Sequence, residues 1–185
     1  MCPRVLAPHD AVWDQRENEN RMAARRRIAR GGKEADDMTR AIKPARARAE
    51  IAVELRVSIA SAADIVTARQ KGRELAMKLG FSGAEVTVIA AAISEIARNI
   101  VDYAQCGEMA MGAVEGRSRR GIGIIARDDG PGIADVAQAM LYGYSSGKKQ
   151  GVGLPGAKWL MDEFEITSKP RKGTTVVMKK WLTES

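Results

Sequence analysis

Polar and apolar residues alternate just after residue 50, where Leu55, Val57 and Ile59 are separated by small or polar residues. This two-residue period is typical of a strand with one buried face. Two helices are predicted next, because a serine stands three residues before an acid at 61–64 and again at 82–85, which is a helix-capping pattern. We expect the first helix to end at Gly80 and the second near Tyr103.

The second predicted helix carries an apolar stripe whose members stand three and four residues apart. The stripe consists of Val86, Ile89, Ile93, Ile96, Ile100 and Tyr103. Residues with this spacing lie on one face of a helix. We therefore expect the whole stripe to face the core.

More strands are predicted in the second half of the chain, at 108–115, 121–127, 164–168 and 174–180. Pro170 and Gly173 indicate a turn between the last two. Residues 129–153 are rich in Gly and Ser and hold one short helix around 135–141, a composition that favours a functional loop. Helices followed by several strands predict an α+β sandwich of two layers, in which helices cover one face of a sheet.

The first 50 residues show no sustained apolar period, so we predict a basic, disordered or loosely helical extension over 1–50 and one domain over 51–185. The net charge is +7, and the extension holds 12 Lys and Arg against 8 Asp and Glu. Its arginines are explained either by solvation or by a tether for acidic partners. Aromatic residues make up only 4% of the chain, which disfavours base stacking and hence a nucleic-acid partner.

The chain has no apolar stretch near the roughly 20 residues that cross a bilayer. Its N-terminus lacks the apolar centre of a secretory leader. We therefore expect a soluble, cytoplasmic protein with no membrane partner.

The first chemical cluster is the pair Glu95 and Asn99, four residues apart on one side of the second predicted helix. An Asn side-chain oxygen is a hard ligand of the kind that suits Mg²⁺. A carboxylate one turn away can accept a proton from an attacking hydroxyl. Exposed Glu and Asn at this spacing are also common on ordinary helix surfaces, so the pair alone does not decide between a site and a surface.

The second cluster, 128–133, reads Asp-Asp-Gly-Pro-Gly-Ile and follows a predicted strand directly. Two glycines around a proline allow a tight turn and a close approach of the backbone. A carboxylate at the strand end can accept hydrogen bonds from an amine edge such as that of adenine. An ordinary turn with a solvated acid pair is the alternative interpretation.

The third cluster is a glycine-rich segment, 147–157, that leads into a predicted helix near Pro155. Backbone N–H groups at such a helix start point toward an anion, and the helix dipole adds to the attraction. This arrangement predicts a phosphate cradle, although a flexible hinge has a similar composition.

Taken in this order, the three clusters resemble the N, G1 and G2 boxes of the GHKL, or Bergerat-fold, ATP-binding superfamily. The stretch from Glu54 to Trp181 is similar, more narrowly, to the RsbT-type switch-protein serine kinases, which are relatives of anti-sigma-factor kinases. The stretches that carry this likeness begin at Ile93, Gly143, Gly151 and Met161. The resemblance implies the GHKL sandwich, with a mixed sheet covered on one face by helices.

The resemblance also implies ATP and Mg²⁺ as cofactors and a role for each matching residue. Glu95 would be the general base and Asn99 the magnesium ligand, while Asp128 would hold the exocyclic amine of adenine. The other residues implied in nucleotide binding are Gly130, Gly132, Ile133, Ser145, Gly147, Lys148, Gly151, Val152, Gly153, Leu154 and Thr174. Lys148 and Lys149 depart from a more glycine-rich lid and would contact phosphate instead.

Finally, the resemblance implies an ATP-dependent protein serine/threonine kinase of a partner-switching stress or sigma-factor module. Its acceptor would be a STAS-type antagonist protein, with a sigma factor or a PP2C-type phosphatase as further partners. The alternative is a non-catalytic, nucleotide-dependent anti-sigma or phosphatase-activating protein. A detached histidine-kinase half is disfavoured, because no helical hairpin with an acceptor histidine precedes the clusters and the one histidine, His9, lies in the extension.

Overall fold

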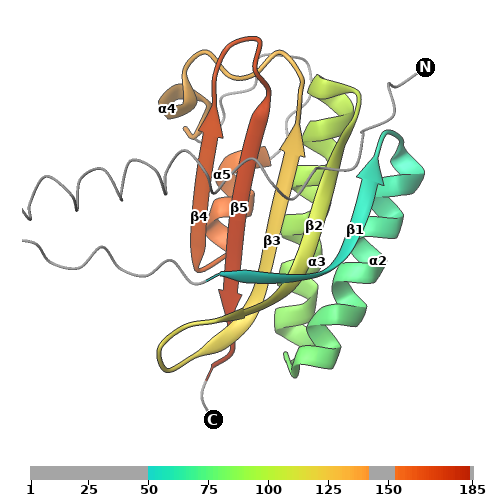
Figure 1. Cartoon of the computed structure of the whole chain (residues 1–185), viewed down its shortest axis with the longest axis vertical. Helices are drawn as coiled ribbons and strands as arrows, with labels where there is room; N and C mark the ends of the chain where they lie inside the picture. Colours follow the sequence, from blue (N-terminus) through green and yellow to red (C-terminus); the bar gives the residue numbers. More distant parts are fainter. Residues whose placement is uncertain (1–49, 142–152, 184–185) are drawn as a thin grey trace, which may run out of the picture. The chain divides into compact units, whose positions relative to one another are not determined.

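The computed structural model describes residues 50–141 and 153–183 of the chain. Its strands pair into one sheet, and α2, α3 and α5 lie against one face of that sheet (Figure 1). In chain order the elements are β1 (Ile51–Ile59), α2 (Ala62–Leu79), α3 (Gly83–Asn99), the π-helical turn η1 (Ile100–Ala104), β2 (Gly107–Glu115), β3 (Arg120–Asp128), α4 (Val136–Ala139), α5 (Gly153–Leu160), β4 (Glu163–Ser168) and β5 (Thr174–Trp181). The predicted α+β sandwich is therefore confirmed.

The strand order across the sheet is β1-β2-β3-β5-β4, and every neighbouring pair is antiparallel. The expectation of a mixed sheet, with parallel and antiparallel pairs, is therefore wrong. Two helices separate β1 from β2, so the chain travels down one and back up the other, and β2 begins beside the end of β1. The later strand pairs β2–β3 and β4–β5 are hairpins, which are antiparallel by construction.

The predicted helix caps are present. The Ser61 side chain accepts a hydrogen bond from the Asp64 amide, and Gly80 ends α2 with a left-handed φ of 97°. Ser82 and Glu85 form a reciprocal capping box at the start of α3, with the Ser82 amide donating to the Glu85 carboxylate at 2.8 Å. These local bonds explain why both helices begin where the sequence pattern places them.

The stripe on α3 packs against the sheet as predicted, with one exception. Val86, Ile89, Ile93, Ile96 and Ile100 are each at most 3% exposed. They pack in one core with sheet residues that include Met109, Met111, Ile122, Ile124 and Met178. Tyr103 is 54% exposed instead of buried, because it lies on η1 beside a cavity rather than above packed side chains.

The proposed extension cannot be compared with this architecture, since residues 1–49 lie outside the described part of the chain. Among the helices that are described, none combines the length and the apolar character needed to span a membrane.

Candidate functional site

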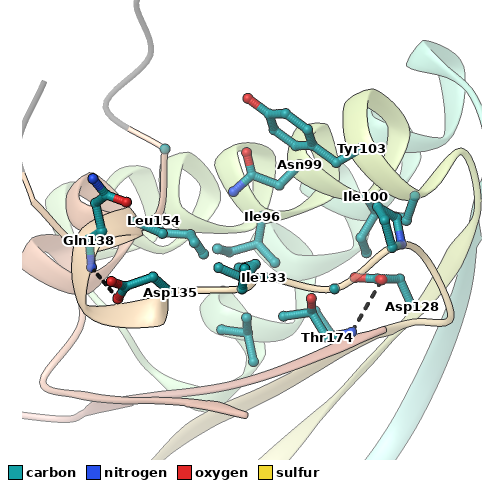
Figure 2. Close-up of a pocket in the computed structure, with 18 residues that line it drawn as sticks. Ile96, Asn99, Ile100, Tyr103, Asp128, Ile133, Asp135, Gln138, Leu154 and Thr174 are labelled. Carbon is teal, nitrogen blue, oxygen red and sulfur yellow. Dashed lines mark hydrogen bonds between the residues drawn. The ribbon is translucent and has the colours of Figure 1, made fainter. Parts of the chain in front are cut away.

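A cavity of about 350 Å³ opens between the sheet and the end of α3. Its walls are mostly apolar and come from α3, η1, β3 and the loop after it, α4, the start of α5, and β5 (Figure 2). The polar side chains that line it are Asn99, Tyr103, Asp128, Asp135, Gln138 and Thr174. An apolar cavity with a few converging polar groups is the usual form of a small-molecule site.

Asp128 ends β3 and presents its carboxylate to this cavity (Figure 2). One oxygen, Oδ1, accepts hydrogen bonds from the amides of Gly130, at 2.9 Å, and Thr174, at 3.2 Å. Burial raises the pKa of Asp128 above its ordinary value, although these two hydrogen bonds oppose the rise. Because Oδ1 is occupied, Oδ2 is the oxygen through which Asp128 can accept a hydrogen bond from a ligand.

Asp129, the next residue, has a different environment. Its side chain is 83% exposed and lies 3.8 Å from the Arg127 guanidinium. Successive side chains of an extended segment point in opposite directions, so only the first acid of the Asp-Asp pair reaches the cavity. Of the two acids, only Asp129 is the solvated side chain of the alternative interpretation.

The turn between β4 and β5 packs backbone to backbone against the loop after β3. The Arg171 amide donates to the Pro131 carbonyl at 2.7 Å. Gly132 (φ +68°) and Gly173 (φ +77°) stand at this contact, where a Cβ would overlap the carbonyls of Lys169 and Asp128 respectively. Both positions therefore require glycine for two reasons, a left-handed φ and the lack of space.

Asn99 is the last residue of α3 and lines the cavity on the side opposite the sheet (Figure 2). Tyr103, one turn further along, stands on η1 above the same cavity. The described residues contain no cluster of three or more His, Cys, Asp or Glu side chains that could hold a metal ion. The Asn99 side-chain oxygen would fit as one ligand of a magnesium ion whose other ligands are water and phosphate oxygens, which is the coordination that Mg²⁺ prefers.

Glu95 does not line this cavity. It lies in a groove of about 640 Å³ between α2 and α3, lined by Arg69, Gln70, Arg73, Thr87, Ala90, Ala91, Ser94 and Glu95. Its Oε1 lies 3.2 Å from Nη1 of Arg98, and its side chain is 18% exposed. Glu95 and Asn99, one turn apart on the same side of α3, thus border two different hollows.

The structure brings together many of the predicted nucleotide-binding residues: Asn99, Asp128, Gly132, Ile133, Gly153, Leu154 and Thr174 line one cavity. Gly130 stands behind the lining, where its amide holds Asp128 and its α-carbon faces Ala104. The predicted residues Ser145, Gly147, Lys148, Gly151 and Val152 lie outside the described residues.

Several lining residues were not predicted, among them Tyr103, Asp135 and Gln138. Asp135 caps α4 by accepting a hydrogen bond from the Gln138 amide at 2.9 Å. The Asp-x-x-Gln spacing is a capping signature, so the sequence carried a signal for this helix start, but none that places it at the cavity. Tyr103 stands one turn after Asn99, a position that could have been read as part of the site.

Fold and cavity together define a class, namely an α+β domain of the ATPase type with its pocket between the sheet and the covering helices. Residues 57–180 match the histidine kinase-like ATPase domain, and the chain belongs to that family.

The chain is similar to a serine/threonine-protein kinase and to anti-sigma factors. It is 47% identical over 119 residues to the serine/threonine-protein kinase RsbT of Bacillus subtilis (strain 168), covering 64% of this chain and 90% of that protein. It is 35% identical over 104 residues to an anti-sigma F factor of Clostridium novyi (strain NT), covering 53% and 72%. A crystal structure of the RsbU and RsbW domains of a Mycobacterium tuberculosis protein aligns with a TM-score of 0.46 and 21% identity, over 68% of this chain and 32% of that one.

Proposed function

We propose that this chain is an ATP-dependent protein serine/threonine kinase of a partner-switching module. One observation carries the proposal: the half-buried acid Asp128 lines a small-molecule pocket that α3 borders, and Glu95 on the same helix lines a groove with Arg69 and Arg73. Transfer between a nucleotide and a protein needs two adjacent sites of this kind. The likeness to a serine/threonine kinase over 90% of its length supports the same function.

In this proposal adenine enters the pocket with its 6-amino group toward Oδ2 of Asp128. The apolar walls, which include Ile96, Ile133 and Val176, enclose the rings. Asn99 would hold Mg²⁺ together with the phosphates, and the ion would neutralise the charge that develops on them.

The acceptor would approach from the groove between α2 and α3. Arg69 and Arg73 line that groove, so it suits a protein segment that carries negative charge near the acceptor hydroxyl. The hydroxyl oxygen forms a bond to the γ-phosphorus while the bond to the bridging oxygen breaks, and ADP leaves with that electron pair. The hydroxyl proton passes to the Glu95 carboxylate, which the ion pair with Arg98 holds in place.

The acceptor class in this proposal is a STAS-type antagonist protein, and a sigma factor or a PP2C-type phosphatase is a further partner. The second candidate function is regulation by binding alone, which the likeness to an anti-sigma F factor supports. Both functions place the protein in the cytoplasm, where sigma factors act.

The test is phosphoryl transfer with Mg-ATP to STAS-domain proteins encoded beside this chain. We expect label on a serine or threonine of the acceptor. A chain that binds ATP and its partner but transfers nothing to any of them would leave regulation by binding as the function.

A charge reversal in the groove tests the acceptor route separately. Arg69→Glu should raise the KM for the acceptor about tenfold and leave the Kd for ATP unchanged, because two charged partners at a surface contribute about 1 kcal/mol or somewhat more. Lys71→Glu is the matched control, since it makes the same charge change on α2 outside the groove lining. Equal effects of the two reversals would contradict a specific acceptor groove.

A further inference from the structure

Ser168, the last residue of β4, stands behind the pocket and joins three groups that build it. Its Oγ accepts a hydrogen bond from the Ile133 amide at 2.8 Å and donates one to the Gly173 carbonyl at 2.9 Å. Its Oγ also lies 3.0 Å from Oγ1 of Thr174. Thr174 lines the pocket, whereas Ser168 does not, so any effect of Ser168 on a ligand passes through Thr174 or Ile133.

A count of protons decides which hydroxyl donates to the other. A serine hydroxyl has one proton and two lone pairs. The Gly173 carbonyl can only accept, so the Ser168 hydroxyl uses its one proton in the hydrogen bond to that carbonyl. The contact with Thr174 must therefore use the Thr174 proton, so that Ser168 accepts twice, donates once and is fully satisfied.

The consequence is that Thr174 turns its proton away from the pocket and offers only lone pairs to a ligand. Asp128 also offers only an acceptor, because its Oδ1 already accepts hydrogen bonds from two amides and Oδ2 of the carboxylate has no proton to donate. Figure 2 shows the Thr174 and Asp128 side chains next to each other at this end of the cavity. This end of the pocket thus presents a pair of acceptors.

We propose that Ser168 is a positioning residue that makes the pocket select 6-aminopurine nucleotides over 6-oxopurine nucleotides. The proposal rests on the proposed function, in that a purine nucleotide must occupy this cavity. A 6-amino group brings two N–H donors to the acceptor pair. A 6-oxo group brings a third acceptor to the same place, and unpaired acceptors that are removed from water are unfavourable.

The test compares the Kd values for ATP and inosine triphosphate, which carries a carbonyl oxygen where ATP carries the amine. Ser168→Ala frees the Thr174 hydroxyl to rotate and donate to that oxygen. The ratio of the Kd for inosine triphosphate to the Kd for ATP should therefore fall about tenfold, or about 1.4 kcal/mol. Ser168→Thr keeps a hydroxyl and should keep the ratio. Thr167→Ala, at an exposed neighbouring position of β4, is the matched control and should also keep it.

Thr174→Val isolates the hydroxyl itself. It leaves the bonds from Ser168 to Ile133 and Gly173 in place, and it should also lower the ratio, so the inference stays testable if Ser168→Ala does not fold. In the Thr174→Val background, Ser168→Ala should change the ratio no further. A purely structural role for Ser168 would weaken both nucleotides equally.

The outcomes separate the two proposals. If the wild-type chain binds neither nucleotide, the proposed nucleotide site is wrong. If it binds ATP but folded Ser168→Ala and Thr174→Val proteins both keep the wild-type ratio, only the role of Ser168 is overturned.

Discussion

Glu95 and Asn99 stand one helical turn apart on α3, yet Glu95 lines the groove beside α2 and Asn99 lines the pocket above the sheet. The two side chains therefore lie near each other on α3 but border different hollows. If the hollows hold acceptor and nucleotide, the functions of the two residues can be separated by mutation.

Glu95→Gln is expected to lower the rate of transfer at least 100-fold, because general base catalysis typically contributes a factor of that size or more. The Kd for ATP should change less than threefold, since Glu95 does not line the pocket. Rapid-quench kinetics and calorimetry measure the two quantities. Glu74→Gln on the exposed side of α2 is the control, and a loss of ATP affinity in Glu95→Gln would show that Glu95 belongs to the nucleotide site.

Asp128→Asn should weaken ATP binding about 100-fold, because the neutral amide no longer attracts the exocyclic amine as a carboxylate does. Asn can still accept from the amides of Gly130 and Thr174 through its own oxygen. The thermal midpoint of the nucleotide-free protein should therefore not fall. A protein with wild-type ATP affinity would remove Asp128 from the site.

The pH dependence of ATP binding provides an independent check on Asp128. Burial raises the pKa of this carboxyl, so as pH falls the carboxylate is protonated, and affinity is lost, at a higher pH than for an ordinary Asp. The stability of the nucleotide-free protein depends on pH in the opposite direction, because a raised folded-state pKa means that protonation of Asp128 at low pH favours the folded state. The acid-side loss of affinity should be absent from Asp128→Asn, and an identical loss in both proteins would assign it to another group.

Gly173→Ala should destabilise the protein by about 3 kcal/mol and abolish ATP binding. The added Cβ meets the Asp128 carbonyl and the left-handed φ is strained as well. Gly80→Ala is a matched control, because Gly80 has a φ of +97° but open space around its missing Cβ. It should cost only about 1 kcal/mol by urea denaturation and leave ATP binding intact.

Glu163 on β4 should contribute stability that depends on pH. Burial raises its pKa, but hydrogen bonds from Lys179, at 3.1 Å, and from Nε1 of Trp181, at 3.0 Å, together with the charges of Lys179 and Arg119, lower it further than burial raises it. A lowered folded-state pKa stabilises the protein above the unfolded-state pKa, and this stability is lost as pH falls through the folded-state value.

Glu163→Gln should therefore cost about 1 kcal/mol at pH 7, as expected for partly exposed charged hydrogen bonds. The difference from wild type should shrink below about pH 4.5, the ordinary value for Glu. Denaturant titrations at several pH values measure it. Glu115→Gln, at the exposed end of β2, is the control, and a difference that stays constant with pH would contradict an ionic role for Glu163.

The sequence was sufficient for the features that depend on neighbouring residues. Ser61 and Ser82 mark the helix starts because their caps are bonds over three residues. The strands follow from their alternating or continuous apolar runs, and the three clusters appear in order along the chain. All of these interactions close within a turn or a strand, so they leave a local pattern.

Only the tertiary structure decided which of these local features meet. The bond from the Thr174 amide to Asp128 joins residues 46 apart in the sequence, and it exists because β5 inserts between β3 and β4. The placement of Tyr103 at a cavity, and of Glu95 and Asn99 in different hollows, depends on what packs on each side of α3. Contacts between distant segments depend on the path of the whole chain, so no local spacing of residues could have predicted them.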